Sequence, residues 1–167
     1  MTTSDKIALA SFIIAALSFI LTIAVIYLTN RHNRLTVKPI FKLIPYDTED
    51  YIAVFIKNSG TGPMLRNKMT IKNNSLTATS LIDLMPSHQT IKWTNFSKFE
   101  EFVIPANETE TLIEIKGDSN NKDFNDYKMQ IRRALKDISI SCEYADIYGQ
   151  KFKSELVKLD YCYGRHF

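Results

Sequence analysis

The first strong pattern in the chain is an uninterrupted apolar run near its start. From Ile7 to Thr29 no residue is charged, and none is glycine or proline. A helix of this length, rising about 1.5 Å per residue, covers about 34 Å, which exceeds a bilayer core of about 30 Å. Because backbone groups in hydrocarbon must bond internally, the run predicts a transmembrane helix. The predicted membrane anchor is represented along its length by Ile7, Phe12, Leu17, Leu21, Val25 and Thr29.

Two alternatives compete for this run. A buried helix of a soluble protein usually has a shorter apolar stretch, of about 10–14 residues. A cleaved signal peptide has an apolar region of about 7–15 residues and ends in a small-x-small site. Here the run ends in Tyr27-Leu28-Thr29-Asn30, which is no such site. We therefore expect a retained signal anchor at residues 7–29, after a short tail (1–6) and before a polar, basic linker (30–36).

The charges that flank the run predict its orientation. Four basic residues follow it: Arg31, Arg34, Lys38 and Lys42. Only Lys6 and the α-amine precede it, beside Asp5. Since positive residues near a span favour the cytoplasm, we expect a single-pass protein with its soluble part in the cytoplasm. The difference in charge is small, so the opposite orientation stays open.

A stripe of small residues runs along the predicted span. Ser11, Ala15, Ser18 and Thr22 recur at helical spacing and form one face on which a second helix can approach closely. The stripe indicates a possible homo-oligomer through the transmembrane helix, although small residues are common in any span.

The rest of the chain is a series of short apolar runs separated by turn residues. Val37–Ile44 contains Pro39, which suits a first or edge strand, and Tyr51–Ile56 is apolar on both faces, as in a central strand. Residues 138–144 alternate between apolar and polar, which is typical of a half-buried strand. Weaker strand signals lie at Met69–Ile71, Leu76–Ile82, Phe102–Ile104 and Phe152–Leu159. The pattern predicts a mainly β fold, a small β-sandwich over residues 37–163, with a short tail at 164–167.

One helix is expected within this sandwich. Phe124, Tyr127, Ile131 and Leu135 lie at helical spacing after Asp123, which we expect to be the N-cap. A basic stripe on the adjacent face consists of Lys128, Arg132 and Lys136. We interpret that stripe as a solvated face, with contact to anionic lipid headgroups as the alternative.

Composition and charge exclude several classes of protein. The 167 residues carry 21 basic and 18 acidic side chains, a balance that disfavours a dedicated nucleic-acid binder. Two cysteines, Cys142 and Cys162, cannot build a disulfide scaffold. His32, His88 and His166 have no partner at metal-ligand spacing, and no nucleophile elbow or phosphate-binding loop is present. We therefore expect no cofactor, no metal and no enzymatic activity.

An aromatic cluster is the one candidate interaction surface. Trp93, Phe96 and Phe99, followed by Phe102, recur every third residue. This spacing fits one face of a helical turn packed on the sandwich. The alternative places these side chains in loops at an open end of the sandwich, where aromatic residues serve as recognition surfaces.

Two stretches carry a resemblance to a known group of proteins. The first is Lys57-Asn58-Ser59-Gly60-Thr61-Gly62-Pro63, and the second runs from Cys142 to Phe152. Together they resemble a group of uncharacterised bacterial single-span membrane proteins with an R-P strand, an N-x-G-x-G-P-A turn and a final Y-x-D-x-x-G-x-x-Y hairpin. Lys38-Pro39 stands for Arg-Pro, Met64 for the alanine and Phe152 for the last aromatic. The resemblance implies an immunoglobulin-like sandwich on an anchor in the inner (cytoplasmic) membrane and brings no established activity.

The residues of these motifs favour a structural role. Gly60 and Gly62 can adopt positive φ and Pro63 fixes φ, so the segment predicts a sharp turn after a strand, held by Asn58. A phosphate cradle is the alternative, although no helix follows the glycines. Similarly, Asp146 is expected to cap a turn that ends at Gly149.

These observations predict a membrane-anchored module that contacts the lipid bilayer and another protein and has no catalytic activity. The alternative is the same domain facing the periplasm, as an envelope-assembly or adhesion-type accessory protein. An enzyme with unrecognised residues is the remaining class.

Overall fold

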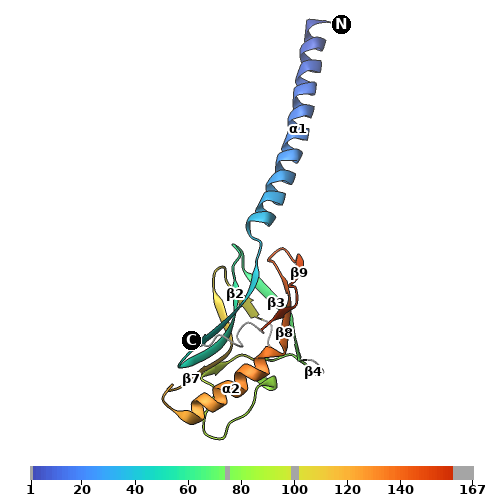
Figure 1. Ribbon diagram of the computed structural model, residues 1–167. Helices are drawn as coiled ribbons and strands as arrows, with labels where there is room; N and C mark the ends of the chain where they lie inside the picture. The colour runs from blue at the N-terminus through green and yellow to red at the C-terminus, as the bar shows by residue number, and fades with distance from the viewer. Residues whose placement is uncertain (1, 74–75, 99–101, 160–167) are drawn as a thin grey trace. The chain divides into compact units, whose positions relative to one another are not determined.

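The structure is a computed structural model that describes residues 2–73, 76–98 and 102–159. It divides into two compact units, Met1–Val37 and Lys38–Phe167. The first contains one helix, α1 (Thr3–Thr36), and the second contains two antiparallel sheets and a second helix (Figure 1). This is the helix-plus-sandwich architecture that the apolar run and the short strands predict.

Helix α1 is long and apolar enough to cross a membrane, a test that a signal sequence near an N-terminus also passes. None of its residues is buried. Thr2 and Asp5 form a capping box at its start, with Thr2 N donating to Asp5 Oδ2 over 2.7 Å. The hydroxyls of Ser18 and Thr22 donate to carbonyls one turn back, both over 2.8 Å. Two hydroxyls of the small-residue stripe are therefore satisfied within their own helix.

The predicted linker at residues 30–36 is helical, as the last two turns of α1. The segment contains no glycine or proline, so nothing in it interrupts the hydrogen-bond ladder. The helix stops where Pro39 disfavours helical geometry in the residue before it. The residues expected as a polar, basic linker are therefore part of α1.

The first sheet has the strand order β1-β2-β7-β5. Its strands are β1 (Phe41–Thr48), β2 (Tyr51–Asn58), β7 (Thr109–Lys116) and β5 (Asn95–Phe96). The predicted first strand lies at an edge, as expected, but begins at Phe41 and so excludes Pro39. The run Tyr51–Ile56 lies in the central strand β2, between β1 and β7. Strand β7 was not foreseen.

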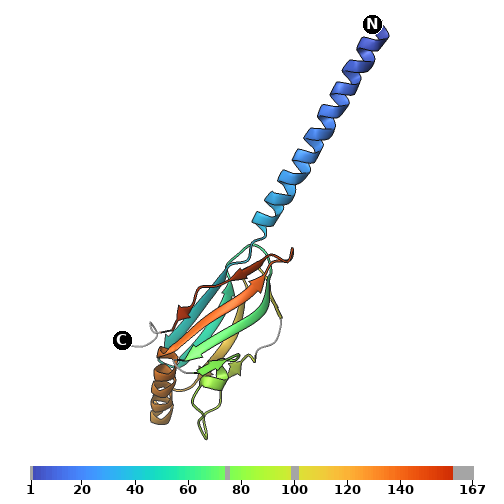
Figure 2. The same ribbon diagram turned by 90° about the vertical axis from the view of Figure 1, so that its right-hand side faces the viewer.

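The second sheet has the order β10-β8-β3-β4, with β6 beside β3 and β9 beside β8 (Figure 2). Its strands are β3 (Met64–Asn73), β4 (Leu76–Ala78), β6 (Phe102–Ile104), β8 (Ile138–Ala145), β9 (Lys151–Lys153) and β10 (Val157–Lys158). The alternation over residues 138–144 is confirmed, because Ile138, Ile140 and Cys142 are buried. Buried side chains of both sheets and of helix α2 form one hydrophobic core.

Helix α2 (Lys122–Lys136) follows β7 and buries Phe124, Tyr127, Ile131 and Leu135, as the spacing predicts. Its N-cap is Asn121, whose Oδ1 accepts from the backbone N–H of Asp123 over 2.9 Å and of Phe124 over 3.3 Å. The prediction of Asp123 as the cap was wrong by two residues.

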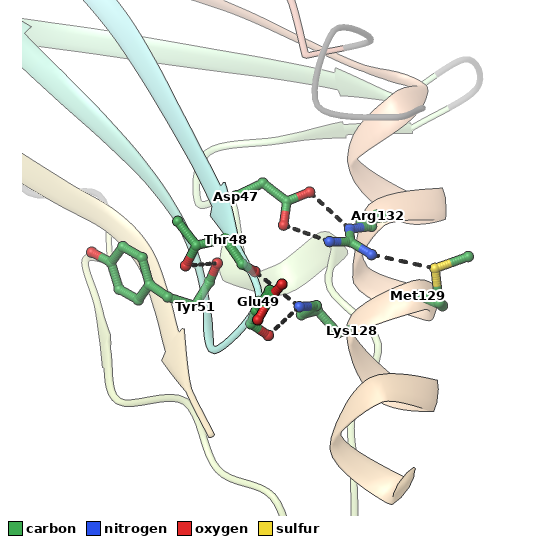
Figure 3. A network of polar contacts seen from close by, with 7 residues as sticks. All are labelled: Asp47, Thr48, Glu49, Tyr51, Lys128, Met129 and Arg132. Atoms are coloured by element: carbon green, nitrogen blue, oxygen red, sulfur yellow. Dashed lines mark hydrogen bonds and ion pairs between the residues drawn. The ribbon is translucent and has the colours of Figure 1, made fainter. Parts of the chain in front are cut away.

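The basic stripe of α2 attaches the helix to the β1–β2 hairpin (Figure 3). Arg132 donates from Nε and Nη2 to the two carboxylate oxygens of Asp47, each over 2.7 Å. Lys128 Nζ donates to the carbonyls of Thr48, over 2.9 Å, and Glu49. Because Lys128 is 4% exposed, these contacts replace its hydration. Lys128 and Arg132 therefore bond within the protein. The interpretation of the stripe as a solvated face and the alternative of a lipid contact are both wrong for these two residues.

Candidate binding groove

A groove of about 440 Å³ lies between α2, β5 and the segment that leads to β5. Its walls are mainly apolar and aromatic side chains, which are Ile82, Met85, Pro86, Ser87, His88, Ile91, Lys92, Trp93, Phe96 and Tyr127. Ile82 belongs to a 3-10 helix, η1 (Ile82–Leu84). Phe96 is 44% exposed, and Trp93 is packed against the core with part of its surface open. The groove therefore combines an aromatic side chain that packs against the core, Trp93, with one that is open to solvent, Phe96.

Tyr127 of α2 organises the wall of this groove. Its hydroxyl donates to the Pro86 carbonyl over 2.7 Å. Its ring lies 4.8 Å from the His88 ring and 6.3 Å from the Trp93 ring, between centroids. Burial raises the pKa of the Tyr127 hydroxyl, so this donor keeps its proton. The contacts of Lys128 and Arg132 with the β1–β2 hairpin hold α2, and thereby this tyrosine, in place.

The segment opposite Tyr127 is fixed by its own hydrogen bonds. His88 Nδ1 accepts from the backbone N–H of Ile91 over 3.1 Å and of Thr90 over 3.3 Å. Ser80 Oγ donates to the Ser97 carbonyl over 3.1 Å, which ties the start of the segment to the residue after β5. These bonds preform the groove.

The groove borders an open sheet edge. Strand β5 is the last strand in its sheet and pairs with β7 through Asn95 opposite Glu114 and Phe96 opposite Ile113. In the described part of the chain no strand lies on its other side. An extended peptide that pairs along this edge would place alternate side chains into the groove.

The structure describes two of the three predicted interaction residues. Trp93 and Phe96 meet in the groove, whereas Phe99 lies outside the described residues. The expected helical turn is wrong, because residues 95–96 and 102–104 are strands. Tyr127 and His88 were not recognised as groove residues. Tyr127 was assigned to the helix core, and nothing in the sequence links it to Trp93.

The predicted turn of Asn58 is a dense hydrogen-bond site. Asn58 is fully buried, and its Oδ1 accepts from the backbone N–H of Gly60 over 3.0 Å and of Ile40 over 3.2 Å. Its Nδ2 donates to the carbonyl of Gly62 over 2.7 Å and to those of Ile104 and Pro105 over 3.1 Å each. The side chain thus joins both sheets at one end of the sandwich.

The glycines of this turn act differently from the expectation. Gly60 and Gly62 have no positive φ. A Cβ on Gly60 would lie 2.2 Å from the carbonyl oxygen of Lys38, so the close approach of two backbones requires glycine there. The N–H groups of Ser59, Gly60 and Thr61 all bond within the protein. The phosphate-cradle alternative is therefore wrong for these donors. Pro63 follows the turn, immediately before β3.

The second predicted turn is confirmed. Asp146 Oδ1 accepts from the backbone N–H of Tyr148 over 2.9 Å and of Gln150 over 2.8 Å. Gly149 has a φ of 78°, which favours glycine, and its N–H donates to the Asp146 carbonyl. Asp146 therefore caps the turn between β8 and β9.

Reactive groups are scarce in the described part of the chain. No three His, Cys, Asp or Glu side chains gather there in a way that would hold a metal. Cys142 is fully buried, and burial raises the pKa of its thiol to about 12. Such a thiol keeps its proton at neutral pH and is a poor nucleophile.

Comparison of the chain with models of known protein families and with curated proteins finds no match.

Proposed function

We propose that this protein is a membrane-anchored β-sandwich module without catalytic activity that binds an extended, apolar segment of a partner protein. Helix α1 is the proposed anchor, and the groove beside β5 is the proposed binding site. We propose that the anchor lies in the inner (cytoplasmic) membrane and the domain in the cytoplasm.

The anchor is supported by the chemistry of α1. A helix of 34 residues without a buried side chain leaves its apolar surface in need of an apolar environment. Its internal polar residues Ser18 and Thr22 use their hydroxyls within the helix, which lowers the cost of placing them in hydrocarbon.

The groove is the single observation that supports binding. Its aromatic residues Trp93, Phe96 and Tyr127 belong to the types that contribute most to interface energy. Phe96 is presented from an edge strand, so a bound peptide gains main-chain hydrogen bonds and side-chain burial together. These features favour an extended peptide with apolar residues at alternate positions.

Trp93 gives a direct test because it is the only tryptophan in the chain. We expect peptides with alternating apolar residues to shift its fluorescence to shorter wavelength, whereas charged peptides of equal length leave it unchanged. Replacing Phe96 with serine should weaken binding about tenfold or more, the usual effect of losing a central aromatic contact. The exposed Leu76, on the other sheet, supplies the control Leu76→Ser. Equal affinities for the two variants would contradict the proposed site.

Orientation is tested with an alkaline phosphatase reporter fused after Phe167, since that enzyme is active only in the periplasm. We expect a silent reporter, because Arg31, Arg34, Lys38 and Lys42 outweigh Lys6. Changing Arg31 and Arg34 to glutamate should raise the signal. Strong activity of the unmodified chain would instead support the periplasmic accessory protein.

A further inference from the structure

The turn between β8 and β9 presents two apolar residues at its tip. Ile147 is 52% exposed and Tyr148 is 46% exposed, whereas turn tips usually carry small or polar side chains. The turn belongs to a different end of the sandwich from the groove, because β8 pairs with β3 through Ala145 opposite Leu65 at this end and Ile138 opposite Asn73 at the other. These two residues therefore need an explanation other than the proposed peptide site.

Four backbone N–H groups of this turn are bonded within the turn. The N–H groups of Tyr148, Gly149 and Gln150 all donate to Asp146, and the N–H of Asp146 donates to the Gln150 carbonyl. Polar backbone groups that bond internally lose little when water is removed around them. The bonding of these four groups lowers the cost of moving the turn into a poorly hydrated environment.

The hairpin lies beside the residue at which the chain enters the domain. Lys38 Nζ lies 5.5 Å from the centroid of the Phe152 ring of β9, and the Lys38 carbonyl accepts from Thr61 N–H in the Asn58 turn. Phe152 in turn stacks on Tyr144 of β8 at 5.5 Å. Lys38 follows the end of α1 by two residues, a span of at most about 8 Å.

Charge at this end is predominantly basic. The segments that form it are 38–42, 57–66, 103–108 and 145–151. Their exposed or half-exposed charged residues are Lys38, Lys42, Lys57 and Lys151, against Glu108. Each lysine close to an anionic bilayer adds to the attraction between the domain and the membrane. The surface thus combines apolar tip residues with a basic surround, as membrane-surface segments do.

We infer that the β8–β9 turn is a second membrane contact, in which Ile147 and Tyr148 enter the headgroup region and the surrounding lysines meet anionic lipid. The inference rests on the proposed membrane anchor. Between the apolar run, which ends at Thr29, and the end of α1 the helix rises about 10 Å. A connection this short limits how far the entry end of the domain can lie from the bilayer surface. Tyrosine is among the residues enriched at that depth.

The test uses the full chain in lipid nanodiscs and a spin label at Gln150, an exposed position that leaves Ile147 and Tyr148 intact. Cys162→Ser removes one thiol, and the burial of Cys142 keeps the other unlabelled. In phosphatidylcholine discs containing phosphatidylglycerol, we expect this label to collide more with oxygen than with an aqueous nickel complex. A label at Leu76, near the other end of β3, should show the reverse.

Two variants separate the contact from the anchor. In the Gln150-labelled chain, Ile147→Ser with Tyr148→Ser should restore collision with nickel, and Lys38→Gln with Lys151→Gln should do so in part. A Gln150 label as exposed to nickel as the Leu76 label, in a chain that resists alkaline extraction, overturns the lipid contact and leaves the anchor standing. Release of the chain by alkaline extraction overturns both.

Discussion

Replacing Gly60 with valine is expected to unfold the domain or to lower its free energy of unfolding by at least about 3 kcal/mol. A Cβ at this position would lie 2.2 Å from the Lys38 carbonyl oxygen and 2.6 Å from the Ile40 nitrogen. Both neighbours are backbone atoms, and both segments are fixed by hydrogen bonds, with Ser59 N–H donating to the Ile40 carbonyl over 2.8 Å. The clash therefore has no flexible side chain that could yield.

Urea unfolding of the detergent-solubilised chain, followed by Trp93 fluorescence, measures this effect. The matched control is Ser59→Val, one residue earlier, because Ser59 is exposed and its substitution adds the same side chain outside the contact. We expect the control to change stability by about 0.5 kcal/mol or less. If both variants unfold at the same urea concentration, residues 38–40 do not pack against the turn as described.

The same turn indicates which parts of the fold are readable from sequence. Asn58, Gly60 and Pro63 predict a sharp turn because their preferences are local. The reason for Gly60 is not local, because it depends on residues 38–40, which no pattern near the turn identifies. Positive φ is the usual reason for a glycine in a turn, and here it applies to Gly149 but not to Gly60.

Strand prediction succeeded where burial follows a simple period. Ile138, Ile140 and Cys142 alternate with half-buried residues, so β8 is visible in the sequence. Strand β7 was missed because it carries Glu110 and Glu114 and buries two consecutive residues, Leu112 and Ile113, which breaks the alternation. The register against β2 shifts at this point, since Val54 pairs with Ile113 and Phe55 with Thr111, so Leu112 is an extra residue in β7.

The groove was only partly predictable for a similar reason. The spacing of Trp93 and Phe96 identifies an aromatic cluster but fits a helix as well as a loop or short strand. Pairing with β7 decides in favour of a strand at residues 95–96, which is a long-range effect. Lys128 and Arg132 look solvated at helical spacing, yet their partners lie in the β1–β2 hairpin, about 80 residues earlier.

The second large effect is expected at Cys142. Burial raises the pKa of its thiol from 9.0 to about 12, Glu143 adds to the rise, and the buried guanidinium of Arg66 opposes it. At pH 8 the native thiolate population is then about a thousandfold below that of an unfolded cysteine. In the Cys162→Ser chain, we expect alkylation by iodoacetamide to be slower by at least this factor in the native state than in urea.

The same shift predicts how stability depends on pH. Below pH 9 the thiol is protonated in both states, so the contribution of Cys142 is constant. Between pH 9 and about 12 the unfolded chain loses this proton while the native chain keeps it, so the free energy of unfolding falls as pH rises. This difference in pKa between the unfolded and native thiol corresponds to a loss of about 4 kcal/mol in the free energy of unfolding.

Other groups titrate in this range, so the measurement is a difference between two proteins. Burial also raises the pKa values of Tyr51 and Tyr127, which lowers stability at high pH in any variant. Cys142→Ala keeps those groups and removes the thiol, so it should lose less stability between pH 9 and 12 than the unmodified chain. Parallel curves, or rapid native alkylation at pH 8, would mean that Cys142 reaches solvent. In that case β8 and β3 would have to open at the pairing of Cys142 with Met69, which is the centre of the second sheet.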